Sequence, residues 1–327
     1  MKAIVITKLG GAEALEVAEV ETPEPCGDQV RIRVRAAGLN RADLMQARGS
    51  YPAPPGVPAD IPGLEYAGEV DELGPNVVGP LKVGDRVFGI VGGGGQAEYV
   101  LSHERMVVPI PANLDFVQAA AVPEVFMTAH DALETQGGVK PGERVLIHAV
   151  GSGVGSAAVQ LAHAMGCIVL GTSRTADKLA QAKALGLDFG IHSNSEDLAD
   201  AVSRHTRGQG VNLVIDLLGA AVLADNVASL ATCGRLIVVG LLGGGSASID
   251  LTTLLRKRIR LIATTLRARP LEEKILVTRG FADRVVPWLE RGLIRPIVDR
   301  VFDLDDVRAA QTRLESNHGF GKVILRL

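Results

Sequence analysis

The hydrophobic positions follow a strand-like pattern in the first part of the chain. Up to about residue 122, short apolar runs are separated by Gly and Pro, which is typical of β-strands joined by turns. We expect these strands at 3–7, 15–20, 29–37, 66–73, 86–90, 97–101 and 106–110. The pattern predicts a small barrel-like β domain, interrupted by a short helix at 40–46 and by a glycine loop at 92–96.

The middle of the chain alternates between short apolar runs and segments with helical spacing. We expect strands at 145–149, 168–171, 189–192, 211–216 and 235–240, with helices at 154–165, 175–185, 196–205 and 222–231 between them. A helix at 124–133 precedes this part, and a last apolar strand from Ile259 to Thr265 follows the basic run at 256–258. The alternation predicts a doubly wound parallel α/β sheet of the Rossmann type.

The remaining residues return to the first pattern. One amphipathic helix is expected at 271–291, followed by β-like segments at 297–301 and 322–325 that are too few to stand alone. We therefore predict that residues 1–122 and 270–327 form one domain, and that residues 123–269 are a dinucleotide-binding domain inserted into it.

Composition and charge argue against several classes of function. The net charge is −3, so the chain lacks the basic field that nucleic-acid binding requires. No apolar segment reaches membrane length, and no secretion signal is recognisable. Three cysteines lie far apart, and none of the seven histidines has zinc-ligand spacing. The expectation is a soluble cytoplasmic protein without a metal site.

A glycine-rich turn stands between the first strand and first helix of the predicted sheet. Its residues are Gly151, Ser152, Gly153, Val154 and Gly155. Glycines let the backbone approach a ligand closely, and the helix start that follows offers unpaired N–H groups to an anion. Such turns also occur without ligands, but the strand and helix on either side favour a seat for a dinucleotide phosphate.

The end of the second predicted strand indicates which dinucleotide binds. No acid occurs at 171–176, where NAD-binding domains usually place one, whereas Ser173, Arg174 and Lys178 can donate to a 2′-phosphate. This favours NADP(H), with the alternative that the two cations only form the solvated first turn of a helix.

Two further segments lie at strand ends. Asp216 is expected to be a structural cap, whereas Gly240, Leu241 and Leu242 follow the fifth strand at the carboxyl edge of the sheet. We expect these three residues near the nicotinamide.

Taken together, these motifs closely resemble the zinc-free quinone oxidoreductases of the medium-chain dehydrogenase/reductase superfamily, essentially from end to end. The resemblance is strongest at residues 38–44, 92–100, 119–124, 152–155, 240–245 and 319–323, and the run at 40–46 with the proline-rich loop after residue 51 is most similar to the branch induced by a tumour suppressor. It implies a GroES-like β-barrel domain, NADPH as the cofactor, and a quinone or related conjugated carbonyl as the substrate.

The resemblance also shows where this sequence differs from relatives that hold catalytic zinc. Asn40 stands where they carry a cysteine, and Gly63-Leu64-Glu65 stands where they carry Gly-His-Glu, so thiolate and imidazole ligands are both missing. Many members contact the 2′-phosphate with a tyrosine after the third strand. Ser193 occupies that place here and can still donate a hydrogen bond.

The resemblance further suggests three catalytic side chains. Asn40 and Tyr51 are expected to face the substrate carbonyl, and Thr128 matches the family position near the nicotinamide. Alternatives are that Asn40 only forms a turn, that Tyr51 packs a proline-rich loop, and that Thr128 packs in the core or bonds to the backbone.

Three functions stay open at this point. They are an NADPH quinone reductase, an enone or enoyl-thioester reductase on the same scaffold, and a protein that binds NADPH with little turnover. A homodimer is expected, because the apolar strand from Ile259 to Thr265 would need to be paired if it forms the sheet edge.

Overall fold

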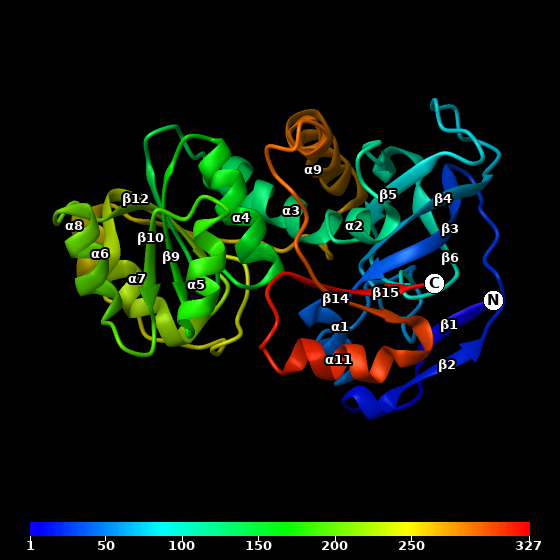
Figure 1. Ribbon diagram of the computed structural model, residues 1–327, viewed down its shortest axis with the longest axis horizontal. Helices are drawn as coiled ribbons and strands as arrows, with labels where there is room; N and C mark the ends of the chain where they lie inside the picture. The colour runs from blue at the N-terminus through cyan, green and yellow to red at the C-terminus, as the bar shows by residue number, and fades with distance from the viewer. The chain divides into compact units, whose positions relative to one another are not determined.

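The computed structural model describes residues 1–327, and the chain divides into two compact units. Unit 1 comprises Met1–Met127 and Leu266–Leu327, and unit 2 comprises Thr128–Thr265. These divisions lie a few residues from the boundaries expected after residues 122 and 269. Both chain termini belong to unit 1 (Figure 1).

Unit 1 is built mainly from strands. They are β1 Lys2–Ile6, β2 Leu15–Glu19, β3 Gln29–Gly38, β4 Glu65–Leu73, β5 Arg86–Ile90, β6 Tyr99–His103, β7 Val108–Pro109, β14 Val298–Asp303 and β15 Lys322–Arg326. The helices that start in it are α1 Arg41–Ala47, α2 Phe116–Ala120, α3 Pro123–His130, α9 Leu271–Arg284, α10 Val286–Glu290 and α11 Val307–Glu315.

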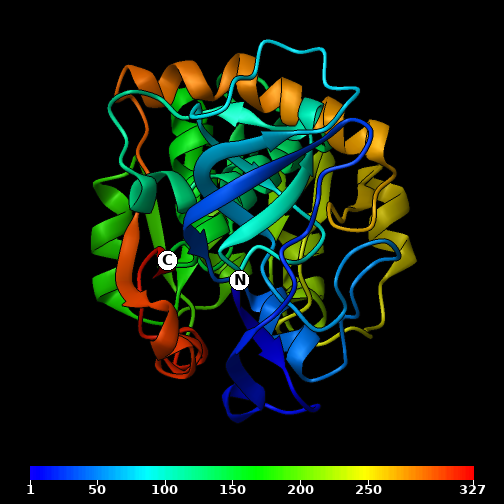
Figure 2. The same ribbon diagram turned by 90° about the vertical axis from the view of Figure 1, so that its right-hand side faces the viewer.

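The long strand β3 organises the sheet of unit 1. The strand order is β14-β15-β3-β4-β5-β7, and β6 pairs with β3 as well. β15 runs antiparallel to β3, so the C-terminal strands extend the sheet formed by the first part of the chain, as the sequence predicted. Alternate β3 residues such as Val30, Ile32 and Val34 are buried in the core. Figure 2 shows these strands, with α9 and α10 in orange along one side of the unit.

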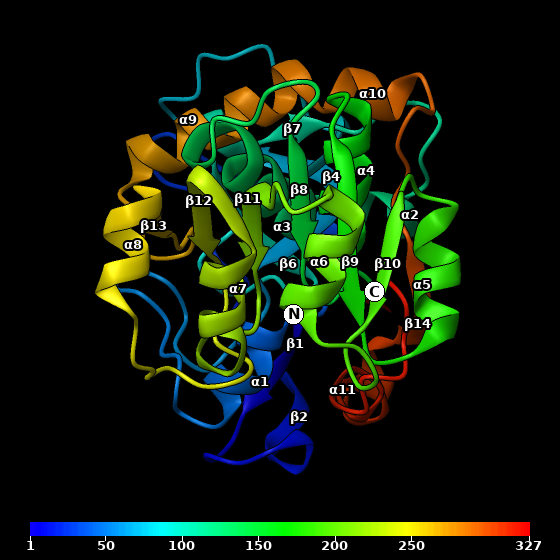
Figure 3. The same ribbon diagram turned by 90° about the vertical axis from the view of Figure 1, so that its left-hand side faces the viewer.

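Unit 2 is a six-stranded parallel sheet in the order β10-β9-β8-β11-β12-β13, shown from β12 to β10 in Figure 3. Its strands are β8 Arg144–Ile147, β9 Ile168–Ser173, β10 Phe189–His192, β11 Val211–Asp216, β12 Leu230–Val238 and β13 Arg260–Ala263. Its helices are α4 Gly153–Ala164, α5 Ala176–Lys183, α6 Leu198–Thr206, α7 Leu223–Ser229 and α8 Leu251–Lys257. This is the doubly wound arrangement that the sequence predicted, with the reversal of strand order between β8 and β11.

Several local predictions were wrong. The strand expected at 97–101 lies two residues later, and the one at 106–110 is only the two-residue β7. The basic run at 256–258 ends helix α8 and was not expected to be helical, and the edge strand that follows it is confined to Arg260–Ala263. The single helix expected at 271–291 is interrupted at Val285, because Pro287 has no N–H for a continuous helix.

The helix α3 continues into a π-helical segment, Asp131–Gln136, in unit 2. Arg235 on β12 holds the end of this segment, because its guanidinium donates to the carbonyl oxygens of Gly137 at 2.8 Å and Gly138 at 3.2 Å. The same side chain forms a two-pronged ion pair with Glu143, at 2.7 and 2.8 Å, and is 5% exposed. Arg235 therefore connects the segment before β8 with strand β12 in the sheet.

None of the helices combines the length and the apolar character needed to cross a bilayer.

Replacing Arg235 by methionine should destabilise the protein strongly, because the Glu143 carboxylate and the carbonyl groups of Gly137, Gly138 and Asn212 lose their donor. We expect a loss of about 3–5 kcal/mol in the free energy of unfolding, measured by urea denaturation. The matched control is Arg204→Met, which removes an ion pair with Glu196 in which the arginine is 58% exposed. Its expected effect is below about 1 kcal/mol, and equal losses in the two variants would contradict the assigned role of Arg235.

Candidate functional site

The predicted phosphate seat lies at the carboxyl end of β8, where α4 begins. Ser152 caps this helix, and its Oγ accepts a hydrogen bond from the Gly155 N–H at 3.0 Å. A side chain at Gly155 would collide with the carbonyl oxygen of Ala149, which itself has a left-handed φ of 51°. The turn from Gly151 to Gly155 is therefore tight for steric reasons, and it directs the start of α4 toward the carboxyl edge of the sheet.

The residues predicted to select NADP(H) gather beside this turn. The Ser193 N–H donates to the Ser173 carbonyl oxygen at 3.0 Å, so the ends of β9 and β10 lie side by side. The stem of Lys178 lies against Gly151, and Arg174 is exposed. Asn194 was not predicted; its Nδ2 lies 3.4 Å from the Arg174 carbonyl oxygen. Hydroxyl, amide and cationic groups thus lie at the carboxyl ends of β9 and β10, where a 2′-phosphate could be held.

The loop after β12 lies beside the end of β11. The Gly240 N–H donates to the Asp216 carbonyl oxygen at 3.2 Å, and Leu241 and Leu242 are 58% and 51% exposed. The Asp216 carboxylate accepts hydrogen bonds from the N–H groups of Leu218 and Gly219, at 2.7 and 2.9 Å. This confirms Asp216 as a structural cap.

The buried His148 connects segments next to these loops through hydrogen bonds. His148 Nε2 lies 2.7 Å from Asn226 Oδ1, and its Nδ1 lies 3.0 Å from Thr172 Oγ1. Burial lowers the pKa of His148, so the ring is neutral. Because Asn226 Oδ1 can only accept, we assign the ring proton to Nε2, and the Thr172 hydroxyl donates to Nδ1. The sequence did not indicate this support, since an isolated histidine carries no motif.

In unit 1, a buried polar cluster joins the ends of α1, β4 and β15. Lys322 Nζ lies 2.6 Å from Glu65 Oε1, and it donates to Asn40 Oδ1 at 2.7 Å and to the Leu39 carbonyl oxygen at 2.6 Å. Asn40 Nδ2 donates to Glu65 Oε1 at 2.8 Å. Lys322 and Glu65 are 4% and 0% exposed, so this ion pair is held by a full set of hydrogen bonds in place of water.

Asp43 extends this cluster. Its carboxylate accepts from the Asn40 N–H at 2.8 Å, from the Gly63 N–H at 3.2 Å and from Gln96 Nε2 at 3.1 Å. Burial raises the pKa of Asp43 to about 6, against the opposite effects of the two N–H groups and of Lys322. The carboxylate therefore fixes the loops that contain Gly63 and Gln96.

The three predicted catalytic residues are placed differently. Asn40 is 9% exposed, and both ends of its amide are bonded within the cluster, to the Gly38 carbonyl oxygen, Glu65 and Lys322. Tyr51 lies in a partly exposed loop of unit 1, and Thr128 is a partly exposed residue of α3 at the start of unit 2.

Arg267 was missed by the sequence analysis, and it holds the Tyr51 loop. Its guanidinium donates to the Gly92 carbonyl oxygen at 2.7 Å, to Gln46 Oε1 at 2.5 Å and to the Tyr51 carbonyl oxygen at 3.2 Å. It also lies over the Tyr51 ring, 5.1 Å from the centroid, and is 7% exposed. Nothing in the sequence distinguishes Arg267 from the neighbouring Arg269.

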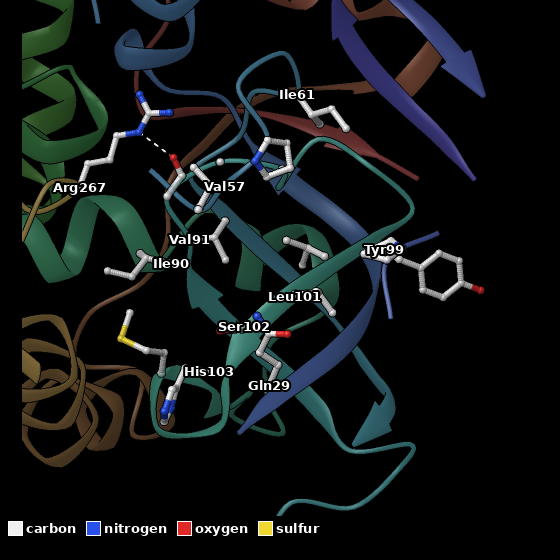
Figure 4. A pocket seen from close by; sticks show the side chains of 18 of the residues that line it. Gln29, Val57, Ile61, Ile90, Val91, Tyr99, Leu101, Ser102, His103 and Arg267 are labelled. Atoms are coloured by element: carbon white, nitrogen blue, oxygen red, sulfur yellow. Dashed lines mark hydrogen bonds between the residues drawn. The ribbon is translucent and has the colours of Figure 1, made fainter. Parts of the chain in front are cut away.

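A cavity of about 480 Å³ opens beside Arg267 in unit 1. Figure 4 shows Val57, Ile90 and Val91 between Arg267 and His103 on its wall. Glu124, in the first turn of α3, also lines it. Burial and the nearby Glu65 and Asp43 raise the pKa of Glu124 to about 8, while Lys322 and Arg267 act in the opposite direction. The cavity thus combines apolar walls with several charged side chains, among them Arg267 and Glu124.

The donor set of the molecule does not fit a metal ion. No group of three or more His, Cys, Asp or Glu side chains is arranged to hold one. In the buried cluster, the Lys322 ammonium already occupies the position beside Glu65 and would repel a divalent cation.

Two protein families match parts of the chain. The model described as "Alcohol dehydrogenase GroES-like domain" matches residues 27–112, and the one described as "Zinc-binding dehydrogenase" matches residues 153–279. Rat quinone oxidoreductase-like protein 2 is 32% identical over 328 residues, which cover 100% of this chain and 92% of the relative. Human quinone oxidoreductase is 31% identical over 334 residues, which cover 100% and 98%.

A solved structure extends the similarity to the fold. The Escherichia coli quinone oxidoreductase complexed with NADPH is 27% identical, with a TM-score of 0.91 and complete coverage of both chains. The GroES-like and Rossmann-like architecture predicted from the sequence is thereby confirmed.

The raised pKa of Glu124 predicts a pH dependence of stability. An acid whose pKa is higher in the folded state than in the unfolded state, here about 8 against 4.5, binds its proton more tightly when folded. The stability that comes from this tighter proton binding is complete below the pKa of the unfolded state. It is lost as the pH rises through the pKa of the folded state. The free energy of unfolding of wild type, relative to Glu124→Gln, should therefore fall between pH 4.5 and 8. Each unit of pKa shift corresponds to about 1.4 kcal/mol.

The measurement is urea denaturation of both proteins across this pH range. Glu273→Gln, which makes the same change on the exposed surface of α9, is the matched control and should follow wild type at every pH. A relative stability that rises with pH would show that Glu124 is ionised by its neighbours, contrary to this account.

Proposed function

The chain belongs to the quinone oxidoreductase family of the medium-chain dehydrogenase/reductase superfamily, and from this premise we propose that it is an NADPH-dependent, zinc-independent quinone oxidoreductase. The observation that carries the proposal is the edge of unit 2 at which Ser173, Arg174 and Ser193 lie beside the glycine turn, with no acid among them. A carboxylate there would repel a 2′-phosphate, whereas these groups can donate to it.

In this proposal, residues of unit 2 bind the cofactor and residues of unit 1 bind the substrate. Gly151, Ser152, Gly153, Val154 and Gly155 would hold the pyrophosphate through backbone N–H groups at the start of α4. Lys178, beside Gly151, would add a positive charge to the phosphate-binding edge, and Gly240, Leu241 and Leu242 would shield the nicotinamide from water. When bound, NADPH supplies the hydride.

On the substrate side, the apolar cavity of unit 1 would accept a flat conjugated carbonyl compound. Tyr51 does not line this cavity itself but is held beside it by Arg267, and its hydroxyl would bond to the carbonyl oxygen of an acceptor that extends toward it, while Thr128 would orient the nicotinamide. Asn40 would act through Glu65 and Lys322, whose positions it determines. A quinone is already electrophilic, so the reaction needs alignment and exclusion of water more than a metal.

Zinc independence rests on the chemistry of the same residues. An amide at Asn40 and an apolar side chain at Leu64 offer neither thiolate nor imidazole, and Lys322 supplies the positive charge next to Glu65. A cytoplasmic location is also part of the proposal, because the free cysteines Cys26, Cys167 and Cys233 suit a reducing compartment.

The test of the cofactor site is Arg174→Ala. We expect the KM for NADPH to rise about 10- to 100-fold, because a charge-assisted bond to the 2′-phosphate is lost, while the KM for NADH stays the same. The assay follows nicotinamide absorbance with 1,2-naphthoquinone as acceptor, and Lys183→Ala at the exposed end of α5 is the charge-matched control. NADPH binding without turnover of any quinone would instead favour a binding protein, and equal use of NADH would refute the assigned 2′-phosphate site.

We expect a homodimer formed through β13. This strand is the edge of the sheet of unit 2, it pairs only with β12, and its Leu261 is 45% exposed. An unpaired apolar edge is stabilised when a second copy extends the sheet.

Leu261→Arg should break this dimer, because a charge would be buried in the contact between the two edge strands. Light scattering should give about twice 34.3 kDa for wild type and about 34.3 kDa for the variant. The control is Leu276→Arg on α9, where the leucine is 69% exposed in unit 1. A monomeric wild type, or a Leu261→Arg variant that stays dimeric, would contradict this interface.

A further inference from the structure

The cavity of unit 1 has a cation without a counter-ion on its wall. Lys274, near the start of α9, lines the cavity and is half-buried. Its ammonium group forms no ion pair or hydrogen bond within the protein. Burial lowers the pKa of Lys274, and no neighbouring carboxylate opposes this effect. Since a charge removed from water is ordinarily paired, Lys274 is a cation that an anionic ligand could complete.

The other basic side chains of the lining already have partners. The Arg267 guanidinium is bonded to three oxygen atoms of neighbouring loops. His103 accepts a hydrogen bond from the Arg105 N–H through Nδ1, at 3.2 Å, and its Nε2 lies 3.7 Å from Asp28. Lys274 is therefore the basic group of the wall that remains open to a ligand.

The acidic side chains of the lining do not neutralise Lys274. They are Glu21, Asp60 and Glu124. Glu21 and Asp60 are exposed to solvent, where water screens their charges. Burial raises the pKa of Glu124 to about 8, so its carboxyl group is mostly neutral at pH 7. The cavity therefore does not repel an anion that approaches Lys274.

A second polar group on the same wall lacks a partner. Ser102 of β6 lines the cavity and is shown there beside Leu101 in Figure 4. It is only 5% exposed, and its Oγ has no partner within hydrogen-bond distance. The neighbouring hydroxyl of Tyr66 also lacks one. Because buried hydroxyl groups are ordinarily bonded, an oxygen atom of a ligand could satisfy Ser102.

The ammonium and the two hydroxyl groups lie around the same part of the cavity. Thr278 follows Lys274 by one turn on the same face of α9, and its Oγ1 lies 3.6 Å from Met106 Sδ. A Cβ placed on Gly89 would lie 2.7 Å from the Tyr66 hydroxyl and 3.0 Å from the Met106 carbonyl oxygen. Met106, which lines the cavity, thus lies between this face of α9 and the hydroxyl groups.

The remaining lining indicates what the body of the ligand should be. Most of it is apolar, and it includes Val57, Ile90, Val91, Leu101 and Leu266. The volume of about 480 Å³ suits a small organic molecule. One ammonium and one hydroxyl can balance a single negative charge, whereas a phosphate dianion needs more donors.

We propose that this cavity binds an apolar monocarboxylate, with its carboxylate bonded to Lys274 and Ser102 and its hydrocarbon chain against the apolar wall. The inference goes beyond the proposed function, because such binding requires neither NADPH nor turnover, and every residue it uses belongs to unit 1.

The test is calorimetric titration of the full chain with octanoate, in the absence of cofactor, and with octan-1-ol as a neutral probe of similar length. Wild type should bind octanoate about 10- to 100-fold more tightly, because only the carboxylate forms a charge-assisted bond. Lys274→Met should abolish this preference, whereas Lys274→Arg should keep most of it. Ser102→Ala should weaken octanoate binding about 3- to 10-fold, in line with one hydrogen bond.

The controls separate recognition from folding. Lys82→Met removes an exposed lysine of unit 1 that does not line the cavity, and it should bind both probes as wild type does. Lys274→Met should match or exceed the melting temperature of wild type, because the ammonium has no partner to lose.

The outcomes decide the inference without turnover. Equal affinity of wild type for octanoate and octan-1-ol, no octanoate binding at millimolar concentration, or an unchanged preference in Lys274→Met would overturn it and leave quinone reduction intact. A wild type that binds octanoate as expected but reduces no quinone would refute the proposed function and leave this site standing.

Discussion

The buried ion pair between Lys322 and Glu65 is the interaction on which unit 1 depends. It joins the last strand of the chain to the start of β4, and through Asn40 it holds the start of α1 as well. A buried ion pair repays its desolvation only when other hydrogen bonds satisfy the remaining donors and acceptors. Here the Lys322 ammonium meets three oxygen atoms, and the second oxygen of Glu65 accepts from the Glu124 N–H. The C-terminal return of the chain is therefore a structural requirement of the site and not merely an added edge.

The same ion pair determines the charge states of its neighbours. Because Lys322 is committed to Glu65, it only partly offsets the burial of Asp43 and Glu124, whose pKa values are raised to about 6 and about 8. One acid is thus ionised and fixes loops, whereas the other keeps a proton at the cavity wall. Two carboxyl groups in one cluster acquire different tasks from their surroundings, as in other sites where burial and like charges separate pKa values.

The sequence predicted unit 2 better than unit 1, for physical reasons. Alternating strands and helices give a regular spacing of hydrophobic residues in the sequence. The glycine turn ending at Gly155 is required by steric contacts between residues that are close in the chain. Helix α8 was missed although Asp250 caps it, because its seven residues are too few to show a clear helical period. The cluster around Lys322 could not be predicted, since its members lie far apart in the chain and a lone lysine or glutamate ordinarily indicates surface. Arg267 escaped notice for the same reason. The family resemblance indicated Asn40, but only the structure shows that its amide is bonded within the protein.

The central proposal is that Lys322 supplies the positive charge beside Glu65 and that quinone reduction by this chain needs no zinc. The most direct measurement is the zinc content of the purified protein, by mass spectrometry of the metal, together with NADPH-dependent quinone reduction before and after treatment with a strong chelator. The account predicts far less than one zinc ion per chain and a rate that the chelator leaves unchanged. One tightly bound zinc ion per chain, with activity that is lost on chelation and regained when zinc is added back, would contradict it.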